Sequence, residues 1–154
     1  MLEVKNLEIS FKNSHPLVQQ VSFSVEKNKT LGIVGESGSG KSISSLAILG
    51  LLPKTATVKG DLFFNQQPLL GYNEQDYQKI RGNEIAMIFQ EPMSSLNPTL
   101  TCGFQVAEML QQHTQLSNQE IKEEVISLFS KVKLPRPEAI YISSSFWHNG
   151  LTFI

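Results

Sequence analysis

The sequence of 154 residues predicts an α/β fold with a helical addition. Three observations support this prediction. Apolar and polar residues alternate in the first third of the chain, as they do in half-buried strands. A glycine-rich loop over residues 35–42 then lies between a short apolar run and a longer run with helical spacing. The last third contains a helix-capping pattern followed by an amphipathic stripe.

Two segments near the N-terminus, residues 4–11 and 21–25, have apolar residues spaced mostly by two, and we expect half-buried strands there. Residues 58–64 predict a third strand. Residues 31–34 and 85–89 are short apolar runs, which are typical of buried strands.

Helices are expected on both sides of the chain's midpoint. Residues 42–52 carry apolar side chains at helical spacing and end at Pro53. One apolar face lies in residues 106–110. The sequence Ser117-Asn118-Gln119-Glu120 forms a capping box, and an amphipathic helix is expected from there to about residue 132.

The composition is that of an ordinary globular protein. Apolar residues make up 40% and charged residues 18%, which allows a core and excludes wholesale disorder. The formal net charge is −1. Proteins that bind nucleic acids usually have a strong excess of basic residues, so we expect no nucleic-acid partner. A single cysteine, Cys102, excludes a disulfide framework within one chain and favours a reducing compartment. We recognise no secretory leader, and the densest apolar run, residues 46–52, is far shorter than the ~18 residues of a membrane span.

Residues 35–42 match the phosphate-binding pattern G-x-x-x-x-G-K-[ST] at every fixed position. They read Gly35, Glu36, Ser37, Gly38, Ser39, Gly40, Lys41 and Ser42. The glycines let backbone N–H groups turn towards a phosphate, and the helix that follows adds its own N-terminal N–H groups. Lys41 supplies a positive charge, and the Ser42 hydroxyl is the expected Mg²⁺ ligand. The motif predicts a P-loop NTPase core that binds a nucleotide; a flexible glycine-rich linker is the alternative.

The apolar run 85–89 ends at Gln90, which Glu91 and Pro92 follow. A glutamine at the end of a buried strand can reach a Mg²⁺ ion or an attacking water through its amide. The residues alone favour the simpler alternative, in which a polar residue and a proline turn close the strand.

Taken together, residues 35–42 and the stretch Ile85-Ala86-Met87-Ile88-Phe89-Gln90-Glu91-Pro92-Met93-Ser94-Ser95-Leu96-Asn97-Pro98 resemble the ATP-binding subunit of ABC transporters. Within these, the chain is similar to the oligopeptide/dipeptide/nickel importer branch, over residues 1 to about 141. The resemblance implies ATP and Mg²⁺ as cofactors. It also implies that Gln90 is the Q-loop residue, which contacts Mg²⁺ and signals to the membrane subunit. Phe11 would stack on adenine; an ordinary inward-facing strand residue is an even alternative.

The same resemblance implies a domain plan and partners. Residues 1–91 would be the N-terminal part of the ATP-binding core, residues 92–141 the start of a helical subdomain, and residues 142–154 an atypical tail. The implied partners are transmembrane permease subunits, a second ATP-binding subunit in a dimer and, indirectly, a solute-binding protein. The implied location is peripheral, at the cytoplasmic face of a bacterial cell membrane, where the intact subunit energises peptide or nickel import by ATP binding and hydrolysis.

Three motifs of this family are not found in the sequence: the Leu-Ser-Gly-Gly-Gln signature, the Walker B aspartate with its neighbouring glutamate, and the switch histidine. We therefore expect a truncated chain with an incomplete sheet, unable to hydrolyse ATP alone. Residues 143–145 are three serines, which a one-base shift in a Pro-His-Gln coding sequence can produce, and our hypothesis is a frameshift or gene fragment from about residue 142. Alternatives are a non-hydrolytic nucleotide-binding or regulatory module, another P-loop enzyme such as a small kinase, or an inert pseudogene product.

Overall fold

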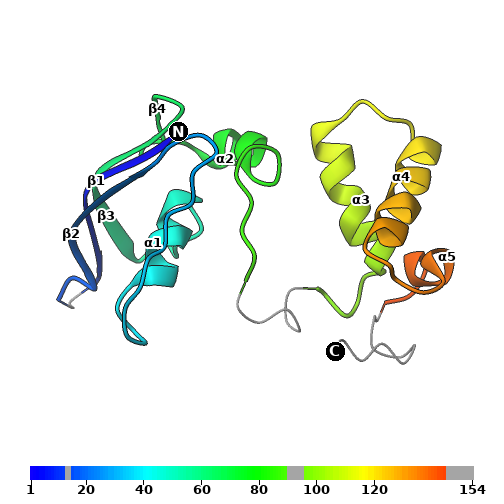
Figure 1. The fold of residues 1–154 in the computed structure, drawn as a ribbon, viewed down its shortest axis with the longest axis horizontal. Helices are drawn as coiled ribbons and strands as arrows, with labels where there is room; N and C mark the ends of the chain where they lie inside the picture. Colours follow the sequence, from blue (N-terminus) through cyan, green and yellow to red (C-terminus); the bar gives the residue numbers. More distant parts are fainter. Residues whose placement is uncertain (13–14, 90–95, 145–154) are drawn as a thin grey trace. The chain divides into compact units, whose positions relative to one another are not determined.

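The computed structural model describes residues 1–12, 15–89 and 96–144. Two compact units divide the chain, residues 1–81 and residues 82–154. In Figure 1 the first unit combines a small sheet with helices, and the regular elements of the second unit's described residues are three helices. Within those ranges, no helix has both the length and the apolar character that a membrane crossing requires.

The sheet of the first unit has four antiparallel strands in the order β2-β1-β3-β4. The strands are β1 Leu2–Phe11, β2 Val18–Val25, β3 Ala56–Phe64 and β4 Gln67–Pro68. The strands expected over residues 4–11, 21–25 and 58–64 are therefore confirmed. β1 lies between β2 and β3, and β3 also pairs with β4.

A bulge in β1 explains why its buried side chains do not alternate strictly. Asn6 has a positive φ of 49°, and the facing Gly60 has a φ of 101°. A Cβ atom on Gly60 would lie 2.5 Å from the carbonyl oxygen of Asn6, so the two strands approach closely here. The extra residue shifts the register of β1 against β3. The side chains that consequently become fully buried, at a spacing of three and then two, are Val4, Leu7 and Ile9.

Two helices complete the first unit. Helix α1, Lys41–Ile48, confirms the helix expected after the glycine-rich loop, although it ends earlier than Pro53. It ends because Gly50 adopts a left-handed φ of 62°, and the Leu51 N–H donates to Leu46 O across the end of the helix. Helix α2, Glu74–Ile80, was not expected; its signal was the capping box formed by Asn73 and Asp76.

The two buried strands expected over residues 31–34 and 85–89 do not form, and that prediction is wrong for this structure. Residues 30–36 have no regular structure, and Ile85 makes only an isolated bridge. Val34 and Ile88 are each 97% exposed. A strand exists only where a neighbour accepts its hydrogen bonds, and no strand in the described part of the chain pairs with either run.

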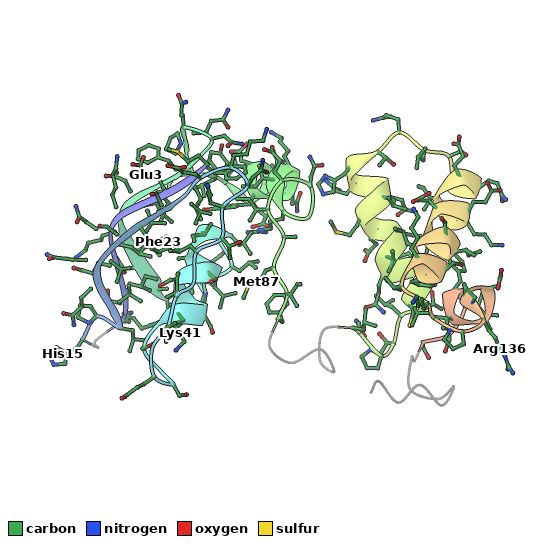
Figure 2. All side chains as sticks on the ribbon, in the orientation of Figure 1. Glu3, His15, Phe23, Lys41, Met87 and Arg136 are labelled. Carbon is green, nitrogen blue, oxygen red and sulfur yellow. The ribbon has the colours of Figure 1, made fainter. Side chains whose placement is uncertain are left out.

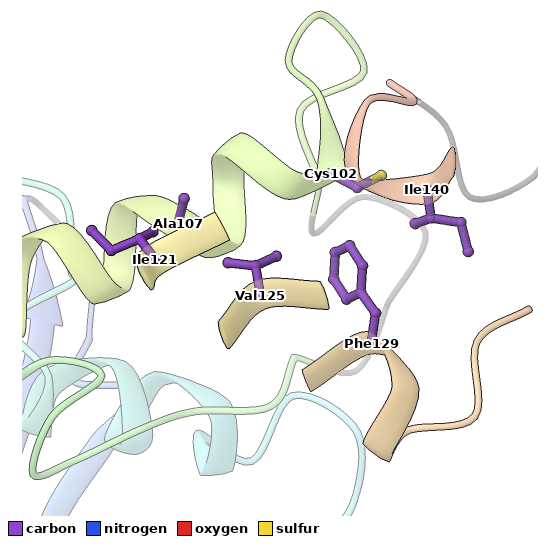
Figure 3. Close-up of a cluster of buried hydrophobic side chains, with 6 residues drawn as sticks. All are labelled: Cys102, Ala107, Ile121, Val125, Phe129 and Ile140. Atoms are coloured by element: carbon purple, nitrogen blue, oxygen red, sulfur yellow. The ribbon is translucent and has the colours of Figure 1, made fainter. Parts of the chain in front are cut away.

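The second unit contains helices α3 Cys102–His113, α4 Asn118–Lys131 and α5 Pro137–Tyr141. The helical character of residues 106–110 and the capping box at Ser117 are confirmed. Figure 3 shows the buried side chains that hold these helices together: Cys102, Ala107, Ile121, Val125, Phe129 and Ile140. Helix α5 starts at Pro137, whose fixed φ suits the first turn of a helix.

The capping box of α4 makes a pH-dependent contribution to stability. The Glu120 carboxylate accepts hydrogen bonds from the hydroxyl and the N–H of Ser117, at 2.7 Å and 2.8 Å. These bonds favour the charged form and hold the pKa of Glu120 below its ordinary value of 4.5. Because the pKa of Glu120 is lower in the folded chain than in the unfolded chain, the charged carboxylate stabilises the fold at pH values above the unfolded-state pKa. This stabilisation is lost as the pH falls through the folded-state pKa.

We predict that Glu120→Gln destabilises the chain at about pH 7, and that the difference from wild type shrinks as the pH falls from about 5 to about 3. Urea unfolding followed by circular dichroism at several pH values measures this difference. Glu108→Gln, at an exposed position of α3, controls for the removal of one negative charge. A difference that grows towards acid pH would contradict the prediction.

Candidate phosphate-binding site

The glycine-rich loop leads directly into helix α1, and Figure 2 shows Lys41 at the first turn of that helix. Within the loop, the Ser39 N–H donates to Glu36 O at 3.2 Å and closes a turn. Gly38 and Gly40 have φ angles of 82° and 90°, in the left-handed region that side chains other than glycine adopt at a cost. The local fold therefore requires glycine at both positions.

Gly40 also lies closely against the start of β2. A Cβ atom at this position would meet Val18 Cγ2 at 2.6 Å and the Leu17 carbonyl oxygen at 3.2 Å. Both Gly40 and Val18 are buried, whereas residues 30–39 are exposed. The contact fixes the point at which the loop joins the helix, and the rest of the loop remains open to solvent.

The N-terminal end of α1 has the chemistry of an anion site. Its N-cap residue is Gly40, which provides no side-chain hydrogen bond to the first N–H groups of the helix. These N–H groups have no partner within the helix and carry the positive end of the helix dipole. The first backbone bond of the helix runs from the Ser44 N–H to Gly40 O at 2.9 Å, and the buried Ser44 hydroxyl donates to the same oxygen. A phosphate group fits such a helix terminus.

The ammonium group of Lys41 lies over the loop. It donates to Gly35 O and Glu36 O at 2.6 Å each, and to Ser39 Oγ at 3.1 Å. The positive charge is thus held within the turn formed by residues 35–39, beside the N-terminal end of α1. The loop, the helix terminus and the ammonium together provide the donors that a chain of phosphates needs.

The expected metal ligands are only partly within the described residues. Ser42 lies exposed in the first turn of α1, and Gln90 lies outside the described ranges. No cluster of three His, Cys, Asp or Glu side chains occurs among the described residues. A lone hydroxyl suits Mg²⁺, which usually keeps several waters and is bound by one or two protein groups together with substrate phosphates.

Phe11 lies at the end of β1, opposite Ala56 of β3, and is partly exposed. Its predicted contact with adenine stays a prediction. The structure adds one feature that sequence reasoning missed, namely the contact of Leu17 and Val18 with the loop. No local sequence pattern signals this contact, because Val18 and Gly40 are far apart along the chain.

Comparison with known proteins gives a consistent family assignment. A family model described as ABC transporter matches residues 18–146. The chain is 43% identical over 145 residues to the oligopeptide transport ATP-binding protein AppD of Bacillus subtilis, covering 91% of this chain and 44% of that protein. It is 44% identical over 143 residues to the dipeptide transport ATP-binding protein DppD of Lactococcus lactis, covering 90% of this chain and 41% of that protein. The metal-staphylopine import system ATP-binding protein CntD of Staphylococcus aureus is 37% identical over 151 residues, which are 97% of this chain and 56% of that protein.

The chain thus spans about half, or less, of the length of the curated relatives that it matches. Among solved structures, the post-hydrolysis dimer of the ATP-binding cassette MJ0796, bound to ADP and Pi, has a similar fold. Its TM-score is 0.74 at 19% identity, covering 99% of this chain and 63% of that chain. The likeness confirms the predicted α/β fold.

Two glycines of the loop provide a matched test of the contact with β2. Gly38→Ala is expected to cost about 1–2 kcal/mol, because its φ is left-handed while a Cβ there would have open space around it. Gly40→Ala is expected to cost about 1–3 kcal/mol more, because its Cβ would overlap Val18 as well. Urea unfolding measures both free energies.

The double variant Gly40→Ala with Val18→Ala identifies the cause of the extra cost. Removal of the valine methyl groups makes room for the new Cβ, so the two substitutions should be less than additive. Equal costs for the two glycine variants, or strict additivity in the double variant, would show that Val18 does not constrain the loop.

Proposed function

The chain belongs to the ABC transporter family, and from that premise we propose that it is the N-terminal part of the ATP-binding component of a peptide- or nickel-type importer. The observation that supports this most directly is the glycine-rich loop at the N-terminal end of α1, with the Lys41 ammonium held across it. The relatives, which include oligopeptide and dipeptide transport proteins and a metal-staphylopine import protein, favour this branch.

In the proposed function the backbone of residues 35–42 and the Lys41 ammonium bind the phosphates of ATP. Ser42 and Gln90 would contact the accompanying Mg²⁺, and Phe11 would lie against the adenine ring. Residues 1–91 form part of the ATP-binding core in this proposal, and residues 92–141 begin a helical subdomain. Residues 142–154 form a tail that differs from the family.

The proposed assembly follows from the family and from what its members' names state. The relatives are named as transport ATP-binding proteins, and the structurally similar cassette is a dimer. We propose transmembrane permease subunits and a second ATP-binding subunit as partners, at the cytoplasmic face of the membrane, with a solute-binding protein that acts indirectly. ATP binding and hydrolysis in such an assembly would drive import of the solute.

Lys41→Ala is expected to raise the dissociation constant for Mg·ATP by about tenfold to a hundredfold, because charge-assisted bonds to phosphate are lost. Equilibrium titration with a fluorescent ATP analogue and magnesium measures this change. Lys54→Ala, which removes an exposed lysine away from the loop, is the matched control and should bind like wild type. Wild-type protein that does not respond to millimolar Mg·ATP would contradict the proposal.

The purified chain alone is expected to show no steady-state ATP hydrolysis above the rate of Lys41→Ala. Hydrolysis in this family needs a base that polarises water and groups that stabilise the transition state, and the sequence has no recognisable signature motif or Walker B pair to supply them. Phosphate release at saturating Mg·ATP tests this expectation. Turnover by wild type that disappears in Lys41→Ala would refute it, while leaving nucleotide binding intact.

A further inference from the structure

Arg81 makes a group of contacts that neither the phosphate loop nor the family resemblance explains. Its Nε donates to Leu49 O at 2.8 Å and its Nη2 donates to Gly50 O at 3.0 Å. Leu49 is the C-cap residue of α1 and Gly50 follows it, so these carbonyl groups lie at the C-terminal end of the helix, where backbone oxygens have no partners within the helix. Arg81 therefore caps the opposite end of the helix from the phosphate loop.

The groups around the Arg81 guanidinium all favour a positive charge. The C-terminal end of a helix carries a partial negative charge, which a positive side chain stabilises. The guanidinium carbon lies 4.8 Å from the centre of the Tyr77 ring, and Nη1 forms an ion pair with Glu74 at 2.5 Å. The side chain of Arg81 is only 21% exposed, so these interactions are partly shielded from water.

Helix α2 packs directly against the same end of α1. A Cβ atom on Gly50 would lie 2.4 Å from the ring of Tyr77, so the glycine allows a close approach that no other residue would permit. The Tyr77 hydroxyl donates to Leu69 O at 3.1 Å, which fixes the ring in place. Burial raises the pKa of this hydroxyl, although the Arg81 charge opposes that effect. Arg81 and Tyr77 thus hold the C-terminal end of α1 together, and we call this pair the clamp. The Arg81 guanidinium lies over the Tyr77 ring and donates to the carbonyls of Leu49 and Gly50.

The position of the phosphate loop depends on how α1 is held. The loop itself, residues 35–39, is exposed and makes few contacts beyond its own turn and Lys41. At its start, α1 is held by the contact of Gly40 with Val18, and at its end by the clamp on Leu49 and Gly50. Because α1 has only eight residues, a tilt at its C-terminal end moves its N-terminal N–H groups by a similar amount.

We propose that Arg81 is a positioning residue for nucleotide binding: it clamps the C-terminal carbonyls of α1 and thereby fixes the helix whose N-terminal end binds phosphate. This inference rests on the proposed function, because it names a residue that acts on the same phosphate site from the far end of the helix. Arg81 does not contact the nucleotide in this proposal.

Arg81→Met tests the proposal, because methionine keeps much of the aliphatic length and removes every donor and the charge. We expect the dissociation constant of the full chain for Mg·ATP to rise about tenfold. Amides of α1 and of residues 38–41 should exchange with deuterium faster, while amides of β1 and β3 and of α4 keep their wild-type rates. Arg81→Lys restores a cation and donors for the carbonyls, and should recover at least half of the lost binding on a logarithmic scale.

Lys79→Gln is the matched control, because Lys79 lies on α2, pairs with Asp76 and is exposed. It should bind Mg·ATP like wild type. If wild type binds and Arg81→Met binds equally well, the positioning role is refuted while the proposed function stands. If Arg81→Met speeds exchange throughout the first unit, or Arg81→Lys rescues nothing, Arg81 supports only the general fold. Failure of wild type to bind Mg·ATP would refute the proposed function itself.

Discussion

The close contact between Gly40 and Val18 is the constraint on which the candidate site depends. A side chain at Gly40 would overlap Val18 and would also require a strained backbone, so the contact exists only because the residue is glycine. It joins the start of α1 to the start of β2, and through β2 to the sheet. The phosphate loop can remain exposed because the residue that follows it is fixed.

The parts of the fold that the sequence predicted correctly are those whose pattern can be recognised within the element itself. Strands β2 and β3 both pair with β1, and each of the three was recognised from its own apolar–polar spacing. The α4 capping box satisfies its own N–H groups with Ser117 and Glu120. For the capping box a local rule suffices, because its hydrogen-bond donors and acceptors lie within the motif; for the strands, the alternation of apolar and polar residues was enough. The phosphate loop belongs to the same class, since its motif specifies both the turn and the helix that follows.

Prediction failed for two short, continuously apolar runs that find no strand partner among the described residues. Residues 31–34 and 85–89 have the composition of buried strands, yet Leu31, Ile33 and Phe89 are between 42% and 49% exposed. Periodicity describes which side chains seek burial, and it does not say which strand will accept their backbone hydrogen bonds. Helix α2 was missed for another reason: only seven residues long, it is recognised by its Asn73–Asp76 cap and not by an apolar stripe. Its consequence, the clamp of Arg81 on α1, links residues 31 or 32 positions apart and no local pattern signals it.

The Lys41 ammonium can exchange its hydrogen bonds to the loop for hydrogen bonds to a phosphate. Its ammonium group has three protons, and the loop accepts all three through Gly35 O, Glu36 O and Ser39 Oγ. A phosphate oxygen that accepts one of these protons replaces a neutral acceptor by a charged one, and such bonds are about twice as strong. The displaced carbonyl group lies in an exposed loop, where water can satisfy it, so the exchange leaves no buried polar group unpaired. The same exposure means that salt weakens the attraction, and affinity must therefore come from several donors acting together on a helix held in one position.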